Sequence, residues 1–198
     1  MSEIFATTMD PTKHQLIAAW LPRQEWFAGE GEAVLETLGG FRLDDPAGAV
    51  GMEFIVVADT AAGEPAIYHV PLAYRGAELP GAEAWLLGTS DHGVLGTRWI
   101  YDGEGDPVWQ AQVRALLAGD VAAQHQNDSH TLEPLVGVDR AAGQGAGEGT
   151  GVAAGNGKIT VIRRPVAGGA GSSGAAAWVT SPWTEAGVPV RGAVIEFS

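Results

Sequence analysis

The sequence contains no cysteine among its 198 residues. Disulfide bonds, thiolate nucleophiles and cysteine-based zinc sites are therefore excluded, and nothing in the composition indicates an oxidising compartment. No stretch is apolar for the roughly 20 residues that a membrane-spanning helix needs, and the N-terminus lacks a basic segment followed by an apolar one. We therefore expect a cytoplasmic protein that does not bind membranes.

Basic residues are also scarce, with 11 Lys and Arg against 24 Asp and Glu, which gives a formal net charge of −13. Proteins that bind nucleic acids or anionic lipid surfaces use clustered positive charge to neutralise phosphate groups. The composition therefore disfavours nucleic acid as a partner. It does not determine the oligomeric state.

Asp10-Pro11 and Asp106-Pro107 each place an N-cap acceptor before a proline that suits the first helical turn. In both cases apolar residues then recur at helical spacing. The pattern predicts helices over residues 11–21 and 107–118, capped by Asp10 and Asp106. Gly119 follows the second helix at the position of a left-handed C-cap.

Segments rich in Val, Ile, Thr and aromatic residues lie between and after the two helices, separated by turn clusters of Asp, Gly and Pro. Because such strands follow one another closely, an antiparallel meander is the default arrangement. We expect an α+β fold in which two main helices pack on one face of a curved antiparallel sheet. Pro71 lacks a ladder donor, so its strand is expected at an edge or with a bulge. The expected strands cover residues 33–43, 52–58, 66–74, 95–101, 131–138, 158–164, 176–180 and 188–197.

Glycine is concentrated in residues 140–157 and again in 166–174. These stretches have few bulky apolar side chains, which predicts mobile loops or linkers. Neither stretch completes a phosphate-binding fingerprint, because Gly157-Lys158 is followed by Ile159 where a P-loop needs Ser or Thr. We therefore assign no cofactor-binding residues.

Metal and nucleophile signatures are equally weak. His125, Asp128 and His130 lie within six residues, but in a polar segment without the fixed geometry that a metal site needs. No G-x-S-x-G elbow occurs, and an acidic chain offers too many carboxylates to single out an acid or a base. His69 is expected in solvent if the Tyr68 face of its strand is the core. We assign no catalytic and no metal-ligating residue.

Four ordered stretches carry a family resemblance. LPRQEWFAGEG at 21–31 resembles the R-x-R/Q-x-W-F-x-G-K-G signature of the N-terminal cap of actinobacterial maltokinases. YHVPLAYR at 68–75 and YDGEGDP at 101–107 resemble the family's Y-x-V-P-L-x-Y-R strand and its Y-D-A/G-x-x-D-P lead into a helix, with LLG at 86–88 between them. The resemblance covers about residues 10–120 and implies that its motif residues are Arg23, Trp26, Phe27, Gly29, Tyr68, Pro71, Tyr74, Arg75, Tyr101, Asp102, Asp106 and Pro107.

Enzymes of this family have a cap, a kinase-like nucleotide lobe and a large catalytic lobe, and they make maltose 1-phosphate from ATP and maltose on the route from trehalose to glycogen. From the length of this sequence we expect no large catalytic lobe. Its residues 121–198 resemble at most a remnant of the small lobe, in which Ile162 stands where the ATP-binding lysine is expected and Lys158 comes too early. Glu30 also replaces the lysine of the cap signature.

We therefore expect a single unit over residues 1–198 that is not an enzyme and needs no cofactor. Three hypotheses remain open. The first is a stand-alone, non-catalytic cap-like protein with a regulatory or partner-binding role toward an enzyme of maltose, trehalose or glycogen metabolism. The second is a small-molecule or oligosaccharide binding module that uses aromatics such as Trp99 or Tyr74. The third is an incomplete ATP-dependent sugar kinase that needs another polypeptide.

Overall fold

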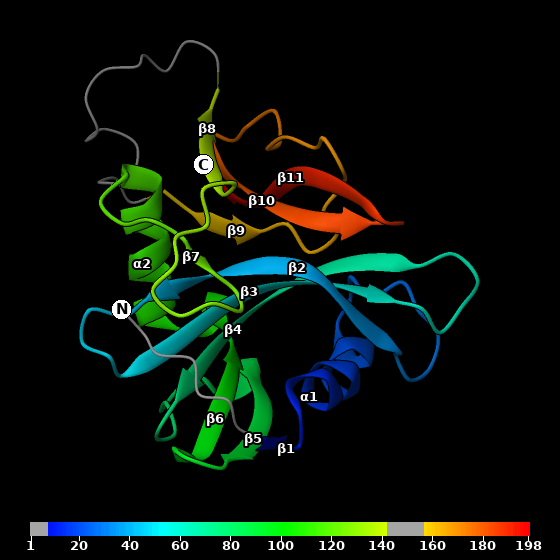
Figure 1. Cartoon of the computed structure of the whole chain (residues 1–198), viewed down its shortest axis with the longest axis vertical. Helices are drawn as coiled ribbons and strands as arrows, with labels where there is room; N and C mark the ends of the chain where they lie inside the picture. The colour runs from blue at the N-terminus through cyan, green and yellow to red at the C-terminus, as the bar shows by residue number, and fades with distance from the viewer. Residues whose placement is uncertain (1–7, 142–156) are drawn as a thin grey trace.

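The computed structural model describes residues 8–141 and 157–198. Within them the chain is mostly antiparallel sheet with two short α-helices, so the α+β expectation holds (Figure 1). The helices are α1 (Lys13–Trp20) and α2 (Pro107–Ala118), with 3-10 turns η1 (Leu21–Arg23), η2 (Glu83–Trp85) and η3 (Gly103–Gly105). The strands are β1 (Met9–Asp10), β2 (Leu35–Asp44), β3 (Val50–Asp59), β4 (Ala66–Arg75), β5 (Leu86–His92), β6 (Gly96–Asp102), β7 (Gln124–His125), β8 (Gly137–Arg140), β9 (Ile159–Val161), β10 (Ala177–Glu185) and β11 (Val188–Phe197).

The sheet is centred on the meander β2-β3-β4, whose strands pair antiparallel along their whole length. On one side the order continues from β4 to β6, β5 and β1. On the other side β2 meets β10, which pairs with β11 and then β9, while β8 pairs with β10. Figure 1 shows β8 to β11 above the meander and β5 and β6 below it.

The junction between β2 and β10 depends on a close backbone approach. Gly39 is the β2 residue that pairs with Trp183 of β10. A Cβ atom at Gly39 would lie 2.8 Å from the Trp183 Cα atom, so no larger residue fits without displacing a strand. Glycine at this position therefore lets the C-terminal strands join the meander.

The sheet also curls back on itself. The backbone N–H of His69 in β4 donates to the carbonyl of Arg163, just after β9, at 2.9 Å. This bond brings the end of the C-terminal strands to the edge of β4 that β6 leaves open. The curl encloses one of the two hydrophobic cores.

The two cores lie on opposite faces of the meander. Successive side chains of a strand point to opposite faces, and in β3 Phe54 belongs to the core with α2, whereas Ile55 belongs to the core with α1. Trp109 of α2 packs in the first core, and Ile17 of α1 packs in the second. The expectation that both helices pack on one face is therefore wrong, because β3 and β4 are apolar on both faces and each face needs its own cover.

Helix α2 begins and ends where the sequence predicts. The Asp106 carboxylate accepts N–H bonds from Val108 and Trp109 at 2.8 and 3.2 Å, Pro107 occupies the first turn, and Gly119 is left-handed at φ 84°. Helix α1 differs at its start. It is capped by Thr12 in a capping box with Gln15, so the helix begins two residues later than expected.

Several strands differ from expectation. Strand β5 was not expected as a strand, and β6 pairs with both β4 and β5. Of the expected strand 131–138, only its last two residues fall in β8. Pro71 was expected at a sheet edge or at a bulge, but it lies in β4, which is an internal strand and pairs with β3 without a register shift. On the other edge of β4, Pro71 falls between the hydrogen bond donated by His69 and the first residue that pairs with β6, Leu72. The ladder therefore needs no donor there.

The glycine-rich stretches have different outcomes. Residues 142–156 lie outside the described residues, so the loop expected over 140–157 is described only at its ends. Arg140 pairs with Ala177, and the Gly157 carbonyl accepts a bond from Arg114 at 2.8 Å. Residues 166–174 form no strand or helix, in agreement with a loop. Across the described parts of the chain, no helix is long and apolar enough to cross a membrane.

Candidate functional site

Arg163 is the centre of a buried polar site that joins distant parts of the chain. Its Nη2 atom lies 2.5 Å from Asp102 Oδ2 and 2.8 Å from Glu104 Oε2. The Arg163 and Asp102 side chains are only 11% and 1% exposed. Because the Arg163 carbonyl also accepts the His69 N–H, this residue joins the C-terminal part to both β4 and the end of β6.

Aromatic rings surround the same guanidinium. The Arg163 Cζ atom lies 5.1 Å from the Trp26 ring centroid and 5.9 Å from that of Trp20. Trp26 in turn lies 5.6 Å from Trp20 and 5.8 Å from Tyr68, and Phe27 lies 5.7 Å from Tyr68. A guanidinium within about 6 Å of a ring face is attracted by the ring quadrupole. We call these six side chains, Arg163, Asp102, Glu104, Trp20, Trp26 and Tyr68, the Arg163 cluster.

The 21–31 stretch is held to this cluster by its backbone. The backbone N–H of Ala28 donates to the Tyr68 hydroxyl at 3.0 Å. A Cβ atom at Gly29 would lie 2.5 Å from the Phe27 ring, so glycine permits the tight turn there. Trp26 and Phe27 are half-buried rather than fully buried, and Arg23 is exposed. The outer side of this stretch therefore faces solvent.

Burial dominates the electrostatics of the cluster. Burial raises the pKa of Asp102, and the adjacent Arg163 charge partly opposes that rise. Burial, followed by the positive charge of Arg163, lowers the pKa of His69 to about 3, against the opposing bond from His69 Nδ1 to the Val194 carbonyl at 3.1 Å. His69 is therefore neutral in the folded protein at neutral pH. The expectation that it is solvated is wrong, because the face opposite Tyr68 also packs a core.

A second polar site joins β4 to α2. Arg75 makes two parallel bonds with Asp106, Nε to Oδ2 at 2.5 Å and Nη2 to Oδ1 at 2.9 Å. The Asp106 side chain is fully buried. The bond to Asp106 raises the pKa of Arg75. The same carboxylate therefore caps α2 and binds the end of β4, which is a structural use of both motif residues.

The two motif tyrosines are also bonded. The Tyr101 hydroxyl accepts the Leu79 N–H at 2.8 Å, and the Tyr74 hydroxyl donates to Glu53 Oε2 at 3.0 Å. Burial, followed by the charge of Glu53, raises the pKa of Tyr74 well above its usual range. Tyr74 packs against the α1 core and Trp99 against the α2 core, so the two aromatics named for the oligosaccharide hypothesis lie on opposite faces of the sheet.

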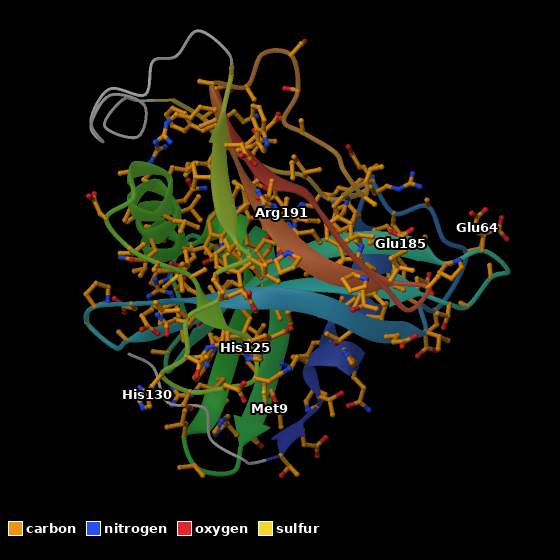
Figure 2. All side chains as sticks on the ribbon, turned by 45° about the horizontal axis from the view of Figure 1, so that its top comes forward. Met9, Glu64, His125, His130, Glu185 and Arg191 are labelled. Atoms are coloured by element: carbon orange, nitrogen blue, oxygen red, sulfur yellow. The ribbon has the colours of Figure 1, made fainter. Side chains whose placement is uncertain are left out.

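The remaining expected site features stay apart. His125 Nδ1 lies 3.1 Å from Asp128 Oδ2, and Figure 2 shows His125 and His130 on the same segment. In the described ranges no three acidic or histidine side chains are grouped as metal ligands would be. Glu30, the charge reversal in the cap signature, is exposed.

Sequence reasoning missed Arg163 and the role of His69. A signal for Arg163 exists, since it is one of only 11 basic residues and lies in the apolar strand-like run that the sequence predicts at 158–164. An arginine in such a run needs a buried partner. Asp102 was recognised only as a motif residue, because its partner lies 61 positions away.

Three of the four motif stretches thus meet at Arg163 or at its neighbours. Residues 20–106 match the family model of the maltokinase N-terminal cap domain. The resemblance inferred from the motifs is therefore confirmed for this range, which we call the cap region. The match covers slightly less than half of the chain and ends at Asp106, so Arg163 comes from outside it. No curated protein matches the chain in sequence.

Proposed function

We propose that this chain is a stand-alone, non-catalytic relative of the maltokinase cap, which binds an enzyme of maltose, trehalose or glycogen metabolism in the cytoplasm. The observation that carries the proposal is the position of Arg163, which follows Ile162 and pairs with carboxylates of the cap region. Where a kinase small lobe would present a lysine to ATP, this chain directs Arg163 into the cap region and neutralises it with Asp102 and Glu104. That arginine is therefore committed to an internal contact.

We further propose that residues 1–198 act as one unit, with 121–198 as a remnant of the small lobe. Support comes from the contacts of Arg163 with the cap region and from the pairing of Trp183 with Gly39. Phosphoryl transfer needs metal-holding carboxylates and a base near the phosphate in addition to a phosphate cradle. The buried motif carboxylates Asp102 and Asp106 are both engaged by arginines.

The partner surface that we propose is the solvent side of the 21–31 stretch. Trp26 and Phe27 are half-buried there, beside exposed Arg23 and Glu25. Half-buried aromatic rings next to an arginine are typical of the residues that dominate protein interfaces. This face is firmly positioned, because the Arg163 cluster holds the inner side of the Trp26 ring.

The test is a binding measurement against purified enzymes that interconvert maltose, trehalose and glycogen, with the chain immobilised. We expect one of them to bind, and Arg23→Glu to weaken that binding at least 10-fold. Arg164→Glu is the matched control, since Arg164 is exposed on the C-terminal segment outside the 21–31 stretch. Equal loss in both variants would indicate a general charge effect, and no binding by any such enzyme would overturn the proposal.

A further inference from the structure

A surface hollow lies among the C-terminal strands, outside the cap region and apart from the Arg163 cluster. It has a volume of about 260 Å³ and is lined from β8, β10, β11 and the loop at 168–170. Asp139, Trp178, Thr180 and Arg191 supply its larger side chains. Figure 2 labels Arg191 among these strands.

The strand register brings Trp178, Asp139 and Arg191 close together. Ala177 and Val179 of β10 point into the α2 core, so Trp178 between them points outward. Thr180 follows a register shift after Val179 and is buried at the base of the hollow. Asp139 of β8 is the partner of Trp178 in the ladder. From β11, Arg191 reaches across to place its Nη2 atom 3.3 Å from Asp139 Oδ2.

The wall of the hollow is fixed by backbone bonds. The Gly168 N–H donates to the Arg191 carbonyl at 2.7 Å, and the Ala193 N–H donates to the Gly169 carbonyl at 2.9 Å. A Cβ atom at Gly192 would lie 2.2 Å from the Val166 carbonyl oxygen, so glycine allows the loop to cross β11 this closely. The hollow is therefore formed before any ligand arrives, which lowers the entropic cost of binding.

The chemistry of the lining selects the ligand. Trp178 is half-buried and offers an apolar aromatic surface. Arg191 donates hydrogen bonds and Asp139 accepts them, and both side chains are 46% exposed, so both can reach a ligand. Their charges cancel, which leaves the lining without net charge, in a chain whose overall charge of −13 repels anions.

We infer that this hollow binds one ring of a neutral saccharide. A sugar ring has an apolar C–H face for Trp178 and hydroxyl groups that both donate and accept, as the Arg191–Asp139 pair requires. The volume lies just below the roughly 300–1,000 Å³ typical of pockets for drug-sized ligands, which fits a single ring. This site is independent of the proposed partner surface, since it shares no residue with the 21–31 stretch.

The test is a titration of the ¹⁵N-labelled full chain with glucose or maltose, followed by NMR. We expect the Trp178 indole N–H signal to shift with a dissociation constant of roughly 1 mM, typical of a weak small-ligand site. Trp178→Ala should raise that constant at least 10-fold and Asp139→Asn at least 3-fold. Trp85→Ala is the matched control, because Trp85 is exposed but lies outside the hollow, and it should leave the constant unchanged.

Glycerol and glucose 1-phosphate complete the design. Shifts at Trp178 with glycerol as large as with glucose would indicate nonspecific polyol contact and would overturn the inference. Tighter binding of glucose 1-phosphate than of glucose would show an anion site and would also overturn it. If Trp178→Ala does not fold, the wild-type shifts must map to the strands around Asp139 and Arg191, and shifts elsewhere refute the site. Arg23→Glu should bind glucose normally, which separates this test from that of the proposed function.

Discussion

Arg163 and Asp102 form an ion pair across 61 positions of sequence, with Nη2 and Oδ2 2.5 Å apart and both side chains nearly inaccessible to solvent. One partner lies in the cap region and the other lies beyond it. Taking two charges out of water costs free energy that their attraction only partly returns. The pair therefore acts mainly by fixing where the C-terminal strands meet β4 and β6.

Removing only Arg163 from the Arg163–Asp102 pair should lower the free energy of unfolding more than removing both charges. We expect Arg163→Met to lower the free energy of unfolding by about 3–5 kcal/mol, because Asp102 is left buried without its counter-charge. Adding Asp102→Asn should recover part of that loss. Urea denaturation of the single and double variants measures both values, and a double variant less stable than Arg163→Met would contradict this account.

Stability should fall in acid through His69. Its pKa is about 3 in the folded protein against an ordinary 6.5, so below pH 6.5 the unfolded chain takes up a proton that the folded chain refuses. The free energy of unfolding should decrease by up to about 1.4 kcal/mol per pH unit until the pH reaches about 3.

Two variants separate the contribution of His69 to this pH dependence from that of the acidic groups that titrate in the same range. His69→Asn does not titrate and keeps a group that can donate to the Val194 carbonyl. We expect its unfolding free energy to depend less steeply on pH between 6.5 and 4 than that of the wild type. His130→Asn is the control, since His130 is exposed with φ 59°, a conformation that Asn tolerates. An equal slope in wild type and His69→Asn would refute the role of His69.

Trp26→Ala should destabilise the protein even though the ring is only half-buried. The substitution removes ring contacts with Trp20 and Tyr68 and the contact with Arg163. Contacts of this kind contribute about 0.5–1.5 kcal/mol each, and about 1 kcal/mol lowers the melting temperature of a chain this size by roughly 2–4 °C. Trp26→Phe should retain most of the stability. A melting curve unchanged by Trp26→Ala would mean that the ring serves binding alone.

Lysine should not replace Arg75. The two parallel bonds to Asp106 use the planar fork of the guanidinium, which an ammonium group cannot reproduce. We expect Arg75→Lys to cost about 1–3 kcal/mol, the range for a lost hydrogen bond to a buried charged group. Circular dichroism melts give the value, with Arg164→Lys as an exposed control. Equal stability of Arg75→Lys and the wild type would show that charge alone suffices.

ATP with magnesium should neither stabilise the protein nor be hydrolysed by it. Ile162 stands at the expected lysine position, and the net charge of −13 repels a polyanion. A ligand at 100 times its dissociation constant stabilises by about 2.7 kcal/mol, which a thermal shift assay detects readily. A shift of that size, or phosphate release, would favour the incomplete-kinase hypothesis instead.

Local chemistry determined much of this protein before the chain folded. Asp106, Pro107 and Gly119 lie within one turn of the helix ends that they mark, so α2 could be predicted residue by residue. The enrichment in β-branched and aromatic residues likewise predicted β3, β4 and β11 to within a few positions, and the family resemblance of four ordered stretches implied the cap region.

Tertiary structure decided which segments far apart in the sequence contact one another. The meander is apolar on both faces, so the cores lie on opposite sides and His69 is buried, which the pattern of one strand cannot reveal. The partnership of Arg163 with Asp102 and the hollow at Trp178 both depend on how the sheet curls and how its strands pair. Sheet curvature and strand order arise from contacts that no local signal encodes, and for that reason only the folded structure could show them.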